Sequence, residues 1–125
     1  FNGTTLTEVN VPITTIWRSF WGTSPSNVYV VGADGFMMRY NGFSWNPLLR
    51  FTDDVWLDTI FGFAEDDIYV GGQRGTLYHF DGTEWTRLSV GGTSGMKAIW
   101  GEDPSEIVIA SGNGVPAIFR YRRTP

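Results

Sequence analysis

Short hydrophobic segments alternate with turn residues along the whole chain. In its middle third these segments cover residues 45–49, 59–61, 68–70 and 76–80, and each is rich in β-branched or aromatic side chains. Glycine and aspartate punctuate the sequence between them. Segments of this length and composition are typical of β-strands, and the residues between them are typical of tight turns. The pattern therefore predicts an all-β fold of short antiparallel strands.

The segments recur in three similar copies. One phrase, an aromatic residue followed by Asn-Gly or Asp-Gly, occurs at 1–3, 40–42 and 80–82. A second phrase, an aromatic residue followed by glycine, ends at Gly22, Gly62 and Gly101. A third, an amide or acid followed by a β-rich run, covers 27–30, 67–70 and 106–109. All three keep a spacing of 39 or 40 residues, which predicts repeats at about 1–40, 41–80 and 81–125.

Each repeat has room for four short strands, which is the size of one blade of a β-propeller. The sequence thus predicts a single propeller domain over residues 1–125 with three four-stranded blades. The aromatic-glycine phrase is predicted to form the innermost strand of each blade. Residues 1–9, with a strand at Leu6–Val9, are predicted to be an outer strand that completes another blade. The last blade, whose third strand lies near Ala117–Tyr121, correspondingly lacks an outer strand of its own.

Three blades do not close a ring well, because closed propellers have about four to eight blades. Two ways of closing the ring stay open at this stage. In the first, two copies of the chain form a homodimeric six-bladed ring, and each copy supplies half of the blades. In the second, the chain is a fragment, and the remaining blades of a longer polypeptide complete the ring. The missing initial methionine and the Thr124-Pro125 end fit the second alternative.

Two features of the turns also follow from the repeats. Gly32–Gly35 and Gly72–Gly75 are predicted to close tight hairpins that need a positive φ. The side chains of Asn27, Asp67 and Glu106 stand just before a strand, and we expect them to bond backbone N–H groups of the preceding turn. Glutamate is less suited to this role than asparagine or aspartate.

Residues 21–45 and 61–85 follow one pattern nearly throughout. It runs from an aromatic-glycine pair through Asn/Asp-Val/Ile-Tyr-Val to Tyr/Phe-Asn/Asp-Gly and a tryptophan. The pattern resembles the repeats of large secreted or cell-surface β-propeller proteins that are common in predatory and environmental bacteria. This resemblance covers almost the whole chain and implies an extracellular, periplasmic or cell-surface location. The third repeat departs from it, with Ser111 in place of a glycine and 122–125 in place of the final phrase.

Composition and charge narrow the classes of function. The 125 residues include 9 basic and 13 acidic side chains, and the net charge of −4 argues against nucleic acid as a partner. No apolar run approaches the roughly 18 residues of a membrane span, so no membrane insertion is predicted. With no cysteine and one histidine, the chain offers neither a thiolate site nor a multi-histidine site, and no metal or cofactor is predicted.

Catalysis is not predicted either. The single histidine, His79, takes the same strand position as Arg39 and, roughly, Arg120, which indicates a surface feature. No serine, histidine and aspartate combine into a nucleophilic set. The chain is therefore predicted to be a binding protein and not an enzyme.

Arg18, Asp58 and Lys97 occupy one equivalent position, four residues before the repeated glycine. On innermost strands that converge around a channel, these side chains would form a ring of charge. One interpretation is that the ring holds a polar ligand. The alternative, which the sequence favours, is ion pairing of Asp58 with Arg18 and Lys97 across neighbouring blades, because paired charges in such walls often only satisfy one another.

Other candidate ligand contacts come from positions that differ between repeats. Trp17 and Trp56 do not repeat at equivalent positions, so both are candidates for exposed contacts with a ligand. The tips between the second and third strands vary most, and they supply the candidates Asp34, Arg74 and Asn113. Variable tips on a rigid scaffold often carry recognition. The alternative is that they are only solvated hairpin tips.

Aromatic residues that do repeat are expected in the core. This group comprises Trp21, Phe61 and Trp100 on the inner strands, and Trp45 and Trp85 on the outer ones. Repetition in every blade is what packing between twisted sheets requires. The alternative is a platform that stacks against sugars.

These observations predict a non-catalytic binding or scaffold module. It would recognise a protein or glycan ligand through loops on one face of the ring. A first alternative is a carbohydrate-binding lectin with one site per blade, since repeated weak sites gain avidity. A second alternative is an accessory subunit of a larger membrane or filament complex.

Overall fold

The structure, a computed structural model, describes residues 16–50, 55–88, 95–111 and 117–122. Residues 1–9, for which an outer strand is predicted, lie outside these ranges. The strands of the described part are β1 (Trp17–Ser24), β2 (Asn27–Gly32), β3 (Phe36–Tyr40), β4 (Trp45–Arg50), β5 (Leu57–Ala64), β6 (Asp67–Gly72), β7 (Leu77–Phe80), β8 (Trp85–Arg87), β9 (Met96–Asp103), β10 (Glu106–Ser111) and β11 (Ala117–Arg122). A short 3-10 turn, η1 (Ala33–Gly35), joins β2 to β3.

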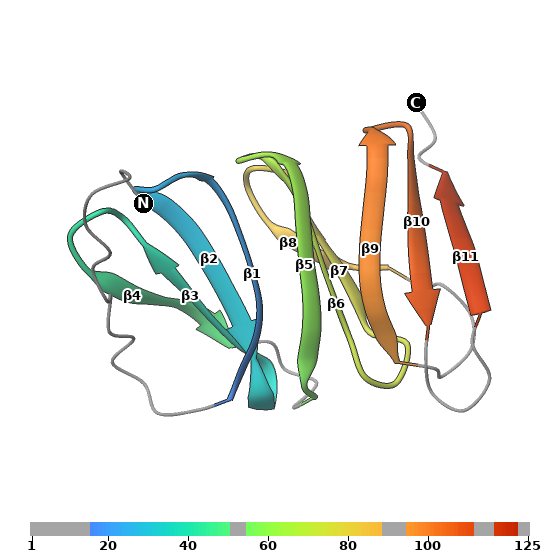
Figure 1. Cartoon of the computed structure of the whole chain (residues 1–125), viewed down its shortest axis with the longest axis horizontal. Helices are drawn as coiled ribbons and strands as arrows, with labels where there is room; N and C mark the ends of the chain where they lie inside the picture. The colour runs from blue at the N-terminus through green and yellow to red at the C-terminus, as the bar shows by residue number, and fades with distance from the viewer. Residues whose placement is uncertain (1–15, 51–54, 89–94, 112–116, 123–125) are drawn as a thin grey trace, which may run out of the picture.

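These strands form three separate antiparallel sheets that follow one another along the chain (Figure 1). The first has the order β1-β2-β3-β4, and the second repeats it as β5-β6-β7-β8. The third contains β9, β10 and β11 within the described residues, so β11 is its outer edge. The all-β antiparallel fold is therefore confirmed. Each four-stranded sheet takes its last strand, β4 or β8, from the start of the following sequence repeat.

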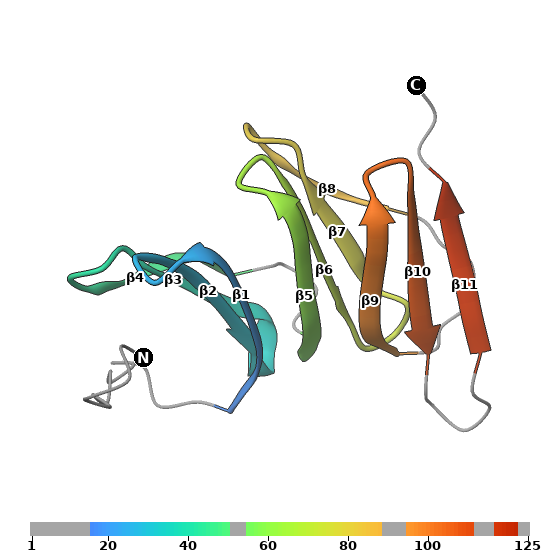
Figure 2. The same ribbon diagram turned by 45° about the horizontal axis from the view of Figure 1, so that its top comes forward.

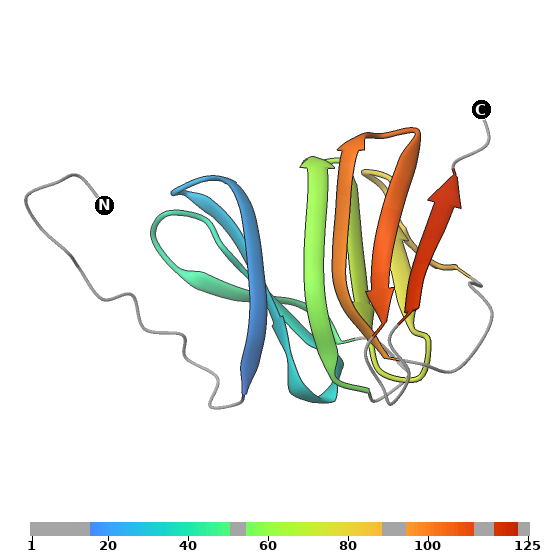
Figure 3. The same ribbon diagram turned by 45° about the vertical axis from the view of Figure 1, so that its right-hand side comes forward.

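The strand that carries the aromatic-glycine phrase lies at the same edge of every sheet. β1 contacts β5, and β5 contacts β9, although these strands belong to different sheets. Figure 3 shows the three strands side by side and running in the same direction. Figure 2 shows the sheets as successive layers that are turned against one another. This is the arrangement of propeller blades, with the inner strands nearest to each other.

The hydrophobic core is divided between the two junctions of neighbouring sheets. At the first junction, Tyr29, Val31 and Met37 of one sheet share a cluster with Leu57 and Ile60 of the next. At the second junction the cluster consists of Tyr69, Leu77, Met96, Ile99, Ile107 and Ile109. All of these side chains are buried. Burial of these side chains therefore depends on contact between neighbouring blades, because both faces of an isolated sheet would be exposed to solvent.

The repeated glycine makes room for an aromatic side chain of the preceding blade. A Cβ atom at Gly62 would lie 2.6 Å from Cη2 and Cζ2 of Trp21. At the next junction, a Cβ atom at Gly101 would lie 2.5 Å from Cζ of Phe63. Any larger residue at these two positions would push the neighbouring ring away. The glycines thus set how closely successive inner strands pack.

The expected burial of the repeated inner aromatics holds for two blades only. Trp21 and Phe61 are partly buried and pack against the two core clusters. Trp45 contacts Tyr40 in the first blade, with the two rings tilted against each other. The prediction is wrong for Trp100, whose side chain is 59% exposed. The reason is its position, because Trp100 lies on the side of the last described sheet where no further sheet follows.

The hairpins between second and third strands have the predicted backbone conformation. Gly35 and Gly75 have φ values of 74° and 67°. The residues before them, Asp34 and Arg74, also have positive φ, at 60° and 59°. Two residues in this conformation match the right-handed twist of the flanking strands. The backbone therefore holds both tips in one defined geometry.

Candidate functional site

One end of the blades gathers most of the predicted site residues. Each inner strand begins where the hairpin between the second and third strands turns, since Trp17 pairs with Gly32 and Leu57 pairs with Gly72. We call this region the charged end. It comprises Arg18, Trp56, Asp58 and Lys97 at the starts of the inner strands and Asp34 and Arg74 at the hairpin tips.

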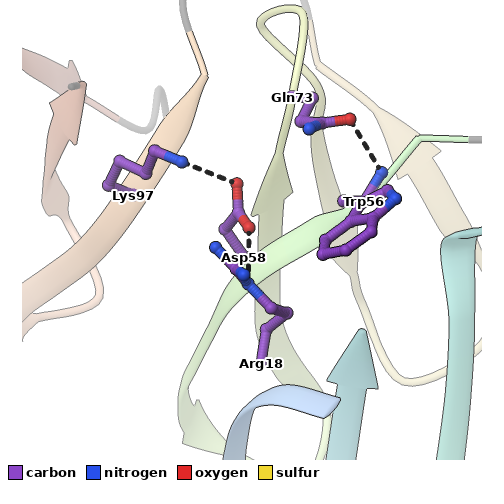
Figure 4. Close-up of polar contacts among 5 residues, drawn as sticks. All are labelled: Arg18, Trp56, Asp58, Gln73 and Lys97. Atoms are coloured by element: carbon purple, nitrogen blue, oxygen red, sulfur yellow. Dashed lines mark hydrogen bonds and ion pairs between the residues drawn. The ribbon is translucent and has the colours of Figure 1, made fainter. Parts of the chain in front are cut away.

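Asp58 forms the centre of the charged end (Figure 4). Its Oδ1 lies 3.1 Å from Nε of Arg18 in the preceding blade, and its Oδ2 lies 3.4 Å from Nζ of Lys97 in the following blade. The Asp58 side chain is only 4% exposed, whereas Arg18 and Lys97 are 39% and 42% exposed. The predicted ion pairs between blades are therefore present. A role of these residues in ligand binding remains a prediction.

Trp56 supports Arg18 from the other side. The guanidinium carbon of Arg18 lies 5.3 Å from the centre of the Trp56 ring, within the range of a cation–π contact. The backbone of Trp56 is tied to Gln73, whose side-chain Oε1 accepts the Trp56 N–H at 3.3 Å and whose N–H donates to the Trp56 carbonyl at 3.0 Å. Gln73 was not among the sequence candidates, because its role depends on the hairpin folding back onto the strand start.

The remaining candidates do not join the Asp58 group. Asp34 and Arg74 are exposed at the hairpin tips of the same end. Trp17 takes the position of Leu57 and Met96 in the other blades, which are buried between sheets. It therefore belongs to the side of the first sheet that would face a preceding blade. Asn113 lies outside the described residues.

A second set of polar pairs lies at the opposite end of the blades and was missed by sequence reasoning. The first residue of each second strand bonds a basic residue on the third strand. Asn27 Oδ1 accepts from Arg39 Nε at 2.6 Å, and Asp67 Oδ1 lies 2.6 Å from His79 Nε2. The spacing of 12 residues in both pairs was the available signal.

The third blade keeps this arrangement with different residues. Glu106 Oε1 lies 3.1 Å from Arg120 Nε, and Oε2 lies 3.5 Å from Arg122 Nε. Asn27 in addition donates to Thr23 Oγ1 at 2.7 Å and to Glu65 Oε1 of the next blade at 2.6 Å. The expectation that Asn27 bonds the backbone of the preceding turn is therefore wrong. The cause is that Thr23, Glu65 and Arg39 lie within reach and engage both the oxygen and the nitrogen of its amide.

Two carboxylates with lowered pKa values build turns. Asp81 accepts the backbone N–H groups of Glu84 at 2.9 Å and Thr83 at 2.8 Å, and these bonds lower its pKa below the ordinary value. The pKa of Asp103 is lowered by the hydroxyl and then the backbone N–H of Ser105. Both carboxylates are exposed. Such geometry stabilises the charged form of a turn residue and provides no proton donor for catalysis.

Chemically, the charged end presents cations. Within the described residues, no group of three or more histidine, aspartate or glutamate side chains could hold a metal ion. In the same ranges, no helix has the length and apolar character needed to cross a membrane. Arg18 and Lys97 are held from one side by Asp58 and reach solvent on the other.

Comparisons with known proteins identify the fold. No protein-family model matches the chain, and no curated protein matches it. Among solved structures, the chain is similar to the one described as YCF48 bound to D1 peptide, with a TM-score of 0.73 and 18% sequence identity. The match covers 90% of this chain and 39% of that one, so the chain spans well under half of the length of that structure. At this level of identity the likeness shows a β-propeller fold.

Proposed function

We propose that this chain supplies blades of a non-catalytic β-propeller module that binds an acidic protein segment at the charged end. Two observations support the proposal. The similar solved structure is described as bound to a peptide. In the present chain, the inner strands bring Arg18 and Lys97 to either side of one carboxylate and leave both cations partly exposed.

The shared contact with Asp58 is the observation that carries the proposal. A nearly buried carboxylate holds two cations that come from two other blades, so their positions are set before a ligand arrives. Preorganisation of this kind lowers the entropic cost of binding. Arg18 contacts Asp58 through Nε, and within the described residues its terminal nitrogens are left for a ligand. A guanidinium with free terminal nitrogens suits carboxylate groups.

The ring must be completed by further blades for the module to work. These blades come either from a second copy of the chain or from the remaining part of a longer protein. A place among the bacterial secreted or cell-surface propeller repeats, and with it an extracellular or periplasmic location, is part of the proposal. It is supported by the sequence pattern of residues 21–45 and 61–85.

Peptide binding tests the proposal directly. Short fluorescein-labelled peptides that are aspartate-rich, neutral or lysine-rich are titrated with the full chain, and fluorescence anisotropy is measured. We expect the aspartate-rich peptide to bind most tightly. Arg18→Ala and Lys97→Ala should each weaken this binding by about tenfold or more, because a charge-assisted hydrogen bond is lost. Arg122→Ala, which removes an exposed cation at the opposite end, should leave it unchanged.

Other outcomes distinguish the alternatives. Equal affinity for aspartate-rich and neutral peptides would contradict the proposal. Binding on a glycan array without peptide binding would favour the lectin alternative. A lectin with one site per blade needs the same exposed aromatic residue in each blade, yet Trp21 and Phe61 are packed against the core clusters while Trp100 is exposed. Stable co-purification with a membrane or filament complex through another surface would favour the accessory-subunit alternative.

A further inference from the structure

The first and the last sheet each present one uncovered side in the described structure. The Phe20 face consists of Trp17, Phe20 and Gly22 on β1. The Trp100 face consists of Trp100 on β9 with Val108 and Ala110 on β10. Phe20 is 74% exposed and Trp100 is 59% exposed. Their equivalents at the internal junctions are buried or packed against the core, so both faces have the character of blade junctions without a neighbour.

The internal junctions show which positions meet. In each sheet, the residue paired with the inner aromatic is equivalent: Tyr29 opposite Trp21, Tyr69 opposite Phe61 and Val108 opposite Trp100. Tyr29 shares its core cluster with Ile60 of the following blade, and Tyr69 shares its cluster with Ile99. Each internal junction therefore combines one tyrosine with one isoleucine.

At the uncovered faces, the larger and the smaller side chain of this pair have changed places. Val108, on the Trp100 face, is smaller than the tyrosines at its position, and Phe20, on the Phe20 face, is larger than the isoleucines at its position. A junction between the two faces would therefore combine valine with phenylalanine and keep a similar total volume. Close-packed interiors tolerate exchanges that conserve volume and are destabilised by those that do not.

A second pair of positions shows the same relation. Gly71 lies against Met96 and Ile99 of the next blade, so the position of Gly71 also faces the following inner strand. Its equivalent in the last blade is the small residue Ala110, and the equivalent of Met96 in the first blade is the large residue Trp17. At these two pairs of positions, the smaller residue stands on the Trp100 face and the larger one on the Phe20 face.

We propose that the Trp100 face docks onto the Phe20 face of a second copy of this chain. The ring of Trp100 would lie against Gly22 of the second copy, as the ring of Trp21 lies against Gly62 within the chain. With three blades per copy, two copies joined in this way at both junctions give a six-bladed ring, within the usual range of about four to eight. This deepens the ring-closing part of the proposed function and is argued from the two faces without use of the peptide site.

One pair of polar positions at the two faces, that of Glu106 and Pro25, fits the same arrangement. At the first internal junction, Asn27 donates to Glu65 of the following blade. In the last blade the equivalent residue is Glu106, which is paired with Arg120 and Arg122 of its own sheet. The residue of the first blade equivalent to Glu65 is Pro25, which brings no charge. Docking of a second copy therefore places no carboxylate against Glu106, whereas a blade with glutamate at that position would repel it.

The Trp100 face is also hollowed where a neighbouring blade would enter. Trp100, Gly101, Val108 and residues of the adjoining turn line a cavity of about 240 Å³. Glu106 and Arg120 form part of its wall. A second copy that fills this cavity would bury the exposed side chains of Trp100 and Phe20. Burial of apolar surface is the main favourable contribution to the free energy of protein association.

The mass of the full chain in solution tests the proposal. We expect light scattering on a sizing column to give about twice 14.0 kDa. Phe20→Ile leaves a void opposite Val108, and Val108→Tyr places a tyrosine against Phe20. Each variant should raise the dissociation constant of the dimer about tenfold or more. Phe43→Thr serves as the control, because Phe43 is 95% exposed on the turn between β3 and β4 and belongs to neither face.

Mixing the two variants gives the decisive result. In a mixed dimer, the two substituted positions meet at one junction, where the introduced tyrosine faces the introduced isoleucine, and the other junction is that of the natural sequence. An equimolar mixture of Phe20→Ile and Val108→Tyr chains should therefore recover the dimer mass, and the double variant should dimerise by itself. A monomeric natural chain, a larger assembly, or a mixture no more dimeric than its components would overturn the proposal. Peptide binding is scored separately, so failure of one proposal is distinguishable from failure of the other.

Discussion

The carboxylate of Asp58 joins the starts of all three inner strands. One oxygen pairs with Arg18 and the other with Lys97, and the side chain is almost fully buried. Removing water from a carboxylate is unfavourable unless its oxygens are occupied. Two cations from two other blades meet this requirement. Burial of the Asp58 carboxylate in its charged form is therefore favourable only when the three blades are in their native positions.

Replacing Asp58 by asparagine therefore destabilises the protein. Asp58→Asn keeps the shape but leaves Arg18 and Lys97 without the shared negative charge, and we expect a loss of about 1–3 kcal/mol in the free energy of unfolding. Urea denaturation at one fixed protein concentration measures the loss. Glu106→Gln is the matched control, because Glu106 also pairs with two cations but is 32% exposed. Its loss should stay below about 1 kcal/mol, and equal losses would contradict the role of burial.

Asp81 contributes to stability in a way that depends on pH. Its pKa in the folded chain is lowered by the N–H groups of Glu84 and Thr83, whereas no such bonds hold it in the unfolded chain. Its contribution is therefore fully present above the unfolded pKa and is lost as pH falls through the lower, folded pKa. In the first blade, the uncharged side chain of Asn41 accepts the equivalent backbone N–H groups of Phe43 and Ser44 through Oδ1.

Asp81→Asn should flatten the acid side of the stability profile. The turn is kept, because asparagine accepts the same N–H groups at position 41, and the titrating group is removed. The free energy of unfolding, measured from about pH 5 to about pH 2, should fall less steeply in the variant than in the natural chain. Parallel profiles for the two proteins would show that this carboxylate does not contribute.

At the scale of elements, the inner strands pack through aromatic rings over glycines. The backbone of β5 at Gly62 lies against the ring of Trp21, and the backbone of β9 at Gly101 lies against Phe63. Glycine is needed at Gly62 for this close approach and not for a special backbone angle, since its φ is not positive. The glycine of the aromatic-glycine phrase is thus repeated because neighbouring blades pack closely at this position.

Gly62→Ala should destabilise the first junction. The added methyl group would meet the Trp21 ring at 2.6 Å, and the resulting shift should cost about 1–3 kcal/mol of unfolding free energy. Trp21→Phe removes the ring atoms that would clash. In a double-mutant cycle, Gly62→Ala should therefore cost less in the Trp21→Phe chain than in the natural chain. An identical cost in both chains would show that the methyl group acts elsewhere.

The sequence predicted the elements well and their side-chain partners unevenly. Repeat phrases define the strands, and equivalence of position was enough to foresee the pairing of Asp58 with Arg18 and Lys97. It did not foresee that Gln73 holds Trp56, because that contact follows from how the hairpin folds back. Burial of Trp100 was predicted from repetition, but burial depends on whether a neighbouring blade is present, which repetition alone does not determine.

For the whole molecule, the outer edge of the last sheet is the main asymmetry. Within the described residues β11 pairs with β10 on one side, whereas β3 and β7 have partners on both sides. An unpaired strand edge favours the addition of another strand. The sequence predicts that residues 1–9 form an outer strand that completes another blade, and these residues lie outside the described ranges. In a ring of two copies, this strand would come from the other copy.

Amide hydrogen exchange of β11 should therefore slow as protein concentration rises. Pairing with a strand from another copy protects its outward N–H groups, while β7, which is already paired on both sides, should exchange at a constant rate. Mass spectrometry of the exchanged chain measures both. Deleting residues 1–9 should abolish the dependence in β11. Exchange of β11 that is independent of concentration, or unaffected by the deletion, would contradict this pairing.

The row of charges on the inner strands has a consequence for a six-bladed ring of two copies. Within one copy, the negative Asp58 separates Arg18 from Lys97. Where one copy meets the next, Lys97 would neighbour Arg18 of the second copy, with no carboxylate between them, and their repulsion opposes closure. An anionic ligand seated there relieves the repulsion, so ligand binding and ring closure become linked equilibria that strengthen each other by the same factor. The apparent affinity for an acidic ligand would then rise with the concentration of the protein itself.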